Sequence, residues 1–121
     1  MFKRNKYRAV RTNGFASKLE AALYALLQAR QSSGEISDIK CQQSVVLQPG
    51  PVKVRIAWKV DFSFLDKHGA LNYAEAKGIE TMDFKLKLKL WRKNPPARLE
   101  IWKGSYRRLL LTEVIERKGE E

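Results

Sequence analysis

The 121-residue sequence predicts an α/β domain whose elements follow the order α-β-β-β-α-β. Three observations support this prediction. Leucines recur at helical spacing between Ala16 and Arg30, which predicts the first helix. Three apolar stretches bounded by turn residues follow, and they predict strands. Segment 81–94 returns to helical spacing before a further apolar stretch near Leu99.

The first helix contains its own start and stop signals. Ser17 and Glu20 have the spacing of a capping box, so Ser17 is expected to cap the helix, and Gly34 is expected to end it. Glu20 has a second interpretation, because it lies in line with Leu23 and Leu27 at the edge of the buried face. There it would supply a carboxylate to a metal site. Local sequence alone favours the role in the cap.

Three strands are predicted between the helices. The first covers Ile36 to Leu47, although Gln42 and Gln43 interrupt its apolar residues. A Pro-Gly-Pro turn at 49–51 separates it from the second strand, which runs from Val52 to Phe64. A tight turn then leads to the third strand, because Asp and Gly tolerate the backbone angles that a hairpin needs.

The hairpin over residues 59–78 contains the residues best suited to chemistry. Asp61 lies within an apolar strand, where a charge is costly unless it is paired or bound to a metal. Glu75, Ala76 and Lys77 end the returning strand. Two neighbouring carboxylates repel each other, and their oxygen atoms suit Mg²⁺ beside a phosphate. The alternative is an edge hairpin in which both acids face solvent and pair with lysines across the strands.

The composition indicates a polyanionic partner. The formal net charge of +11 attracts nucleic acid, although a ribosomal or membrane-surface partner would account for the charge equally well. Cys41 is the only cysteine and His68 the only histidine, which excludes an internal disulfide, a zinc finger and a multi-histidine metal site. No apolar run approaches the ~20 residues of a membrane span, so no membrane partner is expected.

Two basic segments are predicted to contact phosphates. Residues 1–12 are expected to form a flexible basic arm before a single domain over residues 13–118. The second segment is the helix that Thr81 is expected to cap, although the alternating Lys-Leu pattern over residues 85–90 also fits a strand. A solvated tail and a solvated helix face are the alternatives. The residues expected to bind DNA are Lys3, Arg4, Lys6, Arg8, Arg11, Lys18, Lys85, Lys87 and Lys89.

The end of the chain is less clearly patterned. Leu99 and Ile101 predict a last strand. Residues 106–117 fit either a helix or a strand, and the spacing of Leu111 and Ile115 favours a helix.

This ordered set of residues resembles the PD-(D/E)xK nuclease superfamily and, within it, small phage-encoded nucleases of the Holliday-junction-resolvase type. The resemblance covers roughly residues 6–103 and rests on segments 15–20, 60–62 and 75–78. Val60 stands where the superfamily's name has Pro, a position that varies widely among its members. The resemblance implies a restriction-endonuclease-like core, with a mixed β-sheet flanked by helices.

The resemblance also implies roles for individual residues. Asp61, Glu75 and the backbone carbonyl of Ala76 would ligate Mg²⁺, which Mn²⁺ can replace, Lys77 would handle the attacking water, and Glu20 would join the site. The implied function is a structure-specific DNA endonuclease that resolves four-way or other branched DNA as a homodimer. We expect it in the cytoplasm, that of the host if the protein is phage-encoded. Nicking or flap cutting stays open, as does a non-catalytic basic nucleic-acid-binding module whose acids are structural.

Overall fold

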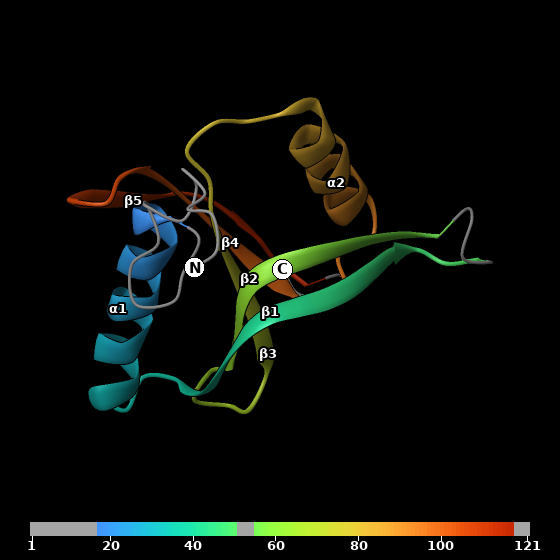
Figure 1. Cartoon of the computed structure of the whole chain (residues 1–121). Helices are drawn as coiled ribbons and strands as arrows, with labels where there is room; N and C mark the ends of the chain where they lie inside the picture. Colours follow the sequence, from blue (N-terminus) through green and yellow to red (C-terminus); the bar gives the residue numbers. More distant parts are fainter. Residues whose placement is uncertain (1–16, 51–54, 118–121) are drawn as a thin grey trace, which may run out of the picture.

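The computed structural model describes residues 17–50 and 55–117, which form a five-stranded sheet with two helices (Figure 1). The predicted α/β class is confirmed. The sheet is mixed, because β3 and β4 run parallel while the other neighbouring strands are antiparallel. The elements are α1 (Lys18–Ser32), β1 (Ser37–Gln48), β2 (Ile56–Leu65), β3 (Leu71–Ala76), α2 (Met82–Lys93), β4 (Arg98–Ser105) and β5 (Arg108–Ile115).

Both helices begin at the predicted caps. The backbone N–H of Glu20 donates to Ser17 Oγ at 3.1 Å, and that of Phe84 donates to Thr81 Oγ1 at 3.1 Å. Each bond satisfies one of the amides that a helix leaves unpaired at its first turn. Segment 82–93 is therefore the predicted helix and not the alternative strand. Neither helix in the described part of the chain is long and apolar enough to cross a membrane.

The segment 106–117 is the clearest correction, because it forms strand β5 and not the favoured helix. The observed order is therefore α-β-β-β-α-β-β. Leu111 and Ile115 are four residues apart, a spacing that keeps two side chains near one face of a helix and also on one face of a strand. The pattern could not separate the two structures. The backbone groups of β4 need hydrogen-bond partners along its outer edge. Strand β5 supplies these partners to β4 over residues 99–105.

Two apolar clusters hold the helices against the sheet, and Figure 1 shows α1 and α2 on different sides of it. Leu23 and Leu27 of α1 pack with the first cluster, over Phe62, Phe64 and Ala74. The second cluster gathers under α2, where its members are Trp58, Val60, Phe84, Leu88, Trp91, Leu99 and Ile101.

Strand β2 changes from one cluster to the other at Asp61. Trp58, Val60 and Phe62 alternate with polar positions, and in a regular strand this spacing would place all three on the same side. Yet Trp58 and Val60 pack under α2, whereas Phe62 packs under α1. Strand β1 bends at the facing position, since Gln42 has a φ of 53° and the neighbouring pairs of the register place it opposite Asp61. Two-stranded ribbons twist strongly, and this twist brings Asp61 to the crossing point between the helices.

Candidate active site

The predicted acidic residues line one hollow of about 450 Å³, here called the acidic cleft. It lies where the first turn of α1 meets the end of β3 and the loop that leads to α2. The structure therefore brings together residues that are far apart in the sequence. Its lining residues are Ser17, Leu19, Glu20, Asp61, Glu75, Ala76, Lys77, Gly78 and Ile79.

Asp61 and Glu75 are tied to each other's strands. The backbone N–H of Asp61 donates to Glu75 Oε1 at 2.9 Å, and the backbone N–H of Ala76 donates to Asp61 Oδ2 at 2.9 Å. The antiparallel register, in which Phe62 pairs with Ala74, sets this arrangement. Glu75 is only 4% exposed, which rules out the solvent-facing edge hairpin for this residue.

The surroundings of these two carboxylates favour their neutral forms. Burial, together with the repulsion of Glu20, raises the pKa of Asp61 to about 7 against the lowering effects of the Ala76 amide and Lys77. Burial and the nearby Asp61 raise the pKa of Glu75 to about 8, again against one backbone hydrogen bond and Lys77. Desolvation therefore outweighs the local donors at both residues. A cation placed between the carboxylates would reverse this balance.

Among the residues that the structure describes, Lys77 forms the ion pair with Glu75, and it compensates the two carboxylates only partly. Its Nζ lies 3.9 Å from Glu75 Oε2 and 5.2 Å from the centroid of the Phe84 ring. Its backbone N–H donates to the Trp102 carbonyl at 2.9 Å, which extends the pairing of β3 and β4 by one residue. The backbone of Lys77 is therefore held in the sheet, while its side chain lines the acidic cleft.

Of the two places that the sequence left open for the side chain of Glu20, in a capping box or at the acidic site, the structure shows the second. Its backbone N–H makes the cap bond to Ser17, while its side chain lines the acidic cleft. Glu20 Oε2 accepts a hydrogen bond from Gln42 Nε2 at 2.8 Å. The carboxylate also acts on Asp61 and Glu75, whose pKa values it raises.

Gln42, which bonds the Glu20 side chain at the cleft, was not singled out as functional by the sequence. The sequence showed that two glutamines interrupt an apolar strand, but it did not show that one of them contacts Glu20 on α1. The described residues contain no cluster of three or more His, Cys, Asp or Glu side chains arranged to hold a metal ion. The acids are therefore brought to one cleft without forming a closed coordination site.

The predicted DNA-binding residues are only partly covered by the structure. Lys85 and Lys89 are exposed one turn apart on α2, whereas Lys87 Nζ lies 3.1 Å from Asp83 Oδ2. Lys18 is exposed, and its Nζ lies 4.9 Å from the centroid of the Tyr106 ring. The predicted arm over residues 1–12, with Lys3, Arg4, Lys6, Arg8 and Arg11, lies outside the described residues.

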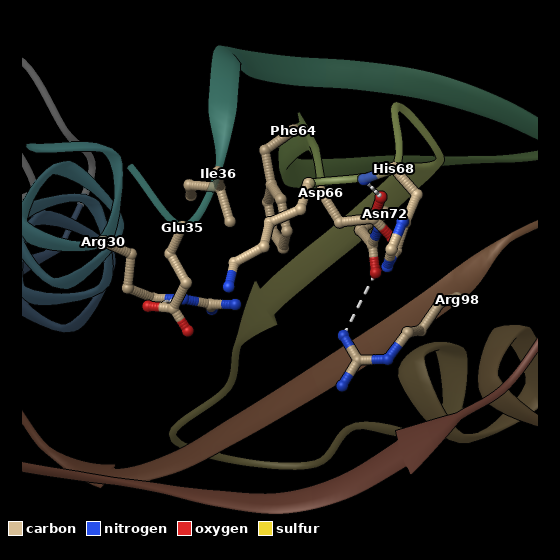
Figure 2. Close-up of a pocket in the computed structure, with 9 residues that line it drawn as sticks. Arg30, Glu35, Ile36, Phe64, Asp66, His68, Asn72 and Arg98 are labelled. Atoms are coloured by element: carbon tan, nitrogen blue, oxygen red, sulfur yellow. Dashed lines mark hydrogen bonds and ion pairs between the residues drawn. The ribbon is translucent and has the colours of Figure 1, made fainter. Parts of the chain in front are cut away.

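A second hollow, of about 250 Å³, lies at the other end of α1 (Figure 2). Figure 2 shows Arg30 of α1 and Arg98 of β4 at this hollow. The uncharged Asn72 accepts a hydrogen bond on its Oδ1 from Arg98 Nη1 at 3.1 Å. Asp66 accepts bonds from the amides of its own turn, which lowers its pKa. Acidic and basic side chains both line this hollow, and ion pairs form between them.

A comparison with models of protein families matches residues 4–118 to a family described as a protein of unknown function, DUF1064. No curated protein and no solved structure matches the chain.

Proposed function

This chain belongs to the DUF1064 family of proteins of unknown function, and from its acidic cleft we propose that it is a Mg²⁺-dependent, structure-specific DNA endonuclease. The observation that carries the proposal is the interlocked pair of Asp61 and Glu75, with Lys77 beside them and Glu20 facing them. A buried carboxylate beside a half-buried one, whose desolvation and repulsion outweigh the attraction of Lys77, is costly for folding alone.

The fold supports a restriction-endonuclease-like core of the PD-(D/E)xK type. A helix precedes three antiparallel strands, and α2 connects β3 to the parallel strand β4. This order agrees with the core that the resemblance to that superfamily implies. It brings the carboxylates of β2 and β3 and the first turn of α1 to one end of the sheet.

The donor chemistry of the cleft fits a hard divalent cation. Asp61 and Glu75, the carbonyl of Ala76 and the carboxylate of Glu20 are the groups that would hold Mg²⁺ or Mn²⁺, and all offer oxygen. Bound there, such an ion would supply an activated water and would neutralise charge on the phosphate.

The chain's own residues would orient the reaction. Phosphodiester hydrolysis forms a bond from the water oxygen to phosphorus and breaks the bond from phosphorus to the 3′ oxygen. The products that the resemblance implies are a 5′-phosphate and a 3′-hydroxyl. The Lys77 ammonium would donate to the attacking water or to a phosphoryl oxygen, which stabilises the charge that develops in the transition state.

Charge on α2 supports the choice of DNA as the substrate. Lys85 and Lys89 project from the helix that starts just beyond the cleft, and the chain has a net charge of +11. Such groups contact phosphates without reading bases. A four-way junction needs two symmetric cuts, so resolution of junctions would require a two-fold homodimer.

The test is a cleavage assay on linear duplex, nicked, flap and four-way junction DNA, each with Mg²⁺, with Mn²⁺ or with chelator. We expect metal-dependent cutting with a preference for branched DNA, and no cutting with chelator. Cutting of all forms at equal rates would remove the structure specificity. Tight DNA binding without cutting under any metal condition would favour the alternative, a non-catalytic basic nucleic-acid-binding module.

A further inference from the structure

Gln42 occupies a backbone conformation that suits glycine better than glutamine. Its φ of 53° lies in the left-handed region, although the residue is in the middle of strand β1. Such strained residues persist where the surrounding structure requires them, and they gather at functional sites. The bend itself is stabilised by Gln43, whose Nε2 donates to the Cys41 carbonyl at 2.9 Å. The bend accounts for a left-handed backbone conformation at this position. It does not account for the presence of glutamine where glycine would fit better.

The side chain of Gln42 supplies that explanation. Its Nε2 donates to Glu20 Oε2 at 2.8 Å, which ties β1 to the first turn of α1 across 22 positions of the sequence. The same bend places Gln42 opposite Asp61 in the register of β1 and β2. An amide donor holds a carboxylate without cancelling its charge, whereas a lysine at this position would compete with a bound cation.

We propose that Gln42 is a positioning residue that holds the Glu20 carboxylate at the acidic cleft. This inference rests on the proposed nuclease function, and it deepens that function by adding a fourth element to the site. Glu20, Asp61 and Glu75 come from α1, β2 and β3, so their mutual geometry depends on how α1 sits against the sheet. Gln42 adds a direct bond from β1 that fixes the side chain of Glu20 and not only its helix. Partners of this kind orient the groups that do chemistry without touching the substrate.

Two substitutions separate the side chain from the backbone bend. Gln42→Asn keeps an amide and tolerates the left-handed conformation, but it is one methylene too short to reach Glu20. Gln42→Gly fits the bend and removes the side chain altogether. We expect both variants to lower kcat by roughly 10- to 100-fold and to weaken Mg²⁺ binding measured by calorimetry, without lowering Tm. The control is Gln48→Asn, the same change at an exposed position of the same strand, which should alter neither quantity.

A double-mutant cycle tests whether Gln42 acts through Glu20. Adding Gln42→Asn to Glu20→Ala should cause no further loss of kcat, because Glu20→Ala has already removed the acceptor of the bond. Independent, additive losses would overturn the proposal, as would wild-type kcat and Mg²⁺ binding in Gln42→Asn.

A nuclear magnetic resonance measurement keeps this inference separate from the nuclease proposal. The side-chain amide signal of Gln42 should shift in Glu20→Gln whether or not the protein cuts DNA, and it should stay in place in the control Glu35→Gln. An amide signal that Glu20→Gln leaves unmoved would overturn the positioning role. A wild-type protein that cuts no DNA, but whose Gln42 signal shifts as expected, would overturn the nuclease function and support the contact.

Discussion

The molecule buries a carboxylate near each end of α1, and the two are compensated very differently. At the C-terminal end, Glu100 is 2% exposed and accepts from Arg98 Nη1 at 2.7 Å and from Arg30 Nη1 at 3.2 Å. The indole N–H of Trp102 donates to the same carboxylate at 3.0 Å. Two guanidinium groups and an indole therefore surround a single negative charge.

At the N-terminal end, Glu75 is almost as deeply buried but has far less compensation. It accepts from one backbone amide, and its nearest cation, the ammonium of Lys77, is 3.9 Å away. A second carboxylate, that of Asp61, lies beside it and raises its pKa further.

The difference shows that burial alone does not mark a functional carboxylate. A buried acid held by two guanidinium groups is a structural ion pair, whereas two adjacent acids that share Lys77 among the described residues leave a negative charge that a ligand could balance. The substitutions below test this contrast between the two ends.

The largest effect is expected at the acidic cleft. Asp61→Asn and Glu75→Gln should each lower the rate of DNA cleavage by about 10³-fold or more, because each removes a charge that the reaction needs. DNA binding should be kept or strengthened, since a negative charge leaves the side facing the phosphate. Initial cleavage rates and binding isotherms on the same DNA measure both effects. Asp83→Asn, an exposed carboxylate on α2, is the matched control, and cleavage by either cleft variant at that control's rate would refute the site.

The second effect belongs to the opposite end and concerns stability. Glu100→Gln should lower the free energy of unfolding by about 3 kcal/mol, because two half-buried guanidinium groups lose the buried carboxylate that balances them. Urea denaturation measures this loss. The cleavage rate per folded molecule should stay at the wild-type value. A Glu100→Gln variant that keeps its stability but stops cutting would show that the two ends are not independent.

The pH dependence of stability should separate the two ends further. The folded-state pKa values of Asp61 and Glu75, about 7 and about 8, lie above their ordinary values near 4. Their neutral forms are therefore fully compatible with the fold at low pH, and that stability is lost as the pH rises through 7 and 8. In metal-free buffer, the Tm of the wild type should fall by several degrees relative to Glu75→Gln between pH 5 and pH 9.

Added Mg²⁺ should reduce this fall in the wild type and not in Glu75→Gln. Calorimetric scans of both proteins, with and without the ion, measure the effect. Parallel Tm curves for the two proteins would mean that Glu75 does not titrate in this range.

The smallest effect concerns the basic face of α2. The double variant Lys85→Ala with Lys89→Ala should lower the slope of log K against log salt concentration by about 2, since each phosphate contact releases roughly 0.9 counterions on duplex DNA. Stability should not change, because both side chains are exposed. Binding titrations across a salt series give the slope. Lys87→Ala, whose ammonium is paired with Asp83, is the control with the smaller expected change, and a double variant with the wild-type slope would exclude this face from binding.

The sequence by itself determined the features that depend on near neighbours. Ser17 and Thr81 cap their helices because the amides that they satisfy are three residues away. The turn at 66–69 also follows from its own residues, and a short turn allows few registers. That turn is the reason Asp61 and Glu75 could be predicted to lie on neighbouring strands.

Only the tertiary structure decided the contacts between distant segments. Ser17 caps α1 through the backbone N–H of Glu20, whereas the Glu20 carboxylate meets Gln42 on β1, a contact that no local pattern indicates. The strand β5 formed because β4 had an edge to pair, and the spacing of its leucines fits a helix equally well. Whether a buried acid is balanced, as Glu100 is, depends partly on Arg30, which comes from α1 and is 70 positions away in the sequence, beside Arg98 of its own strand. Local periodicity cannot specify such pairings, because the energy of each one exists only once both segments are packed together.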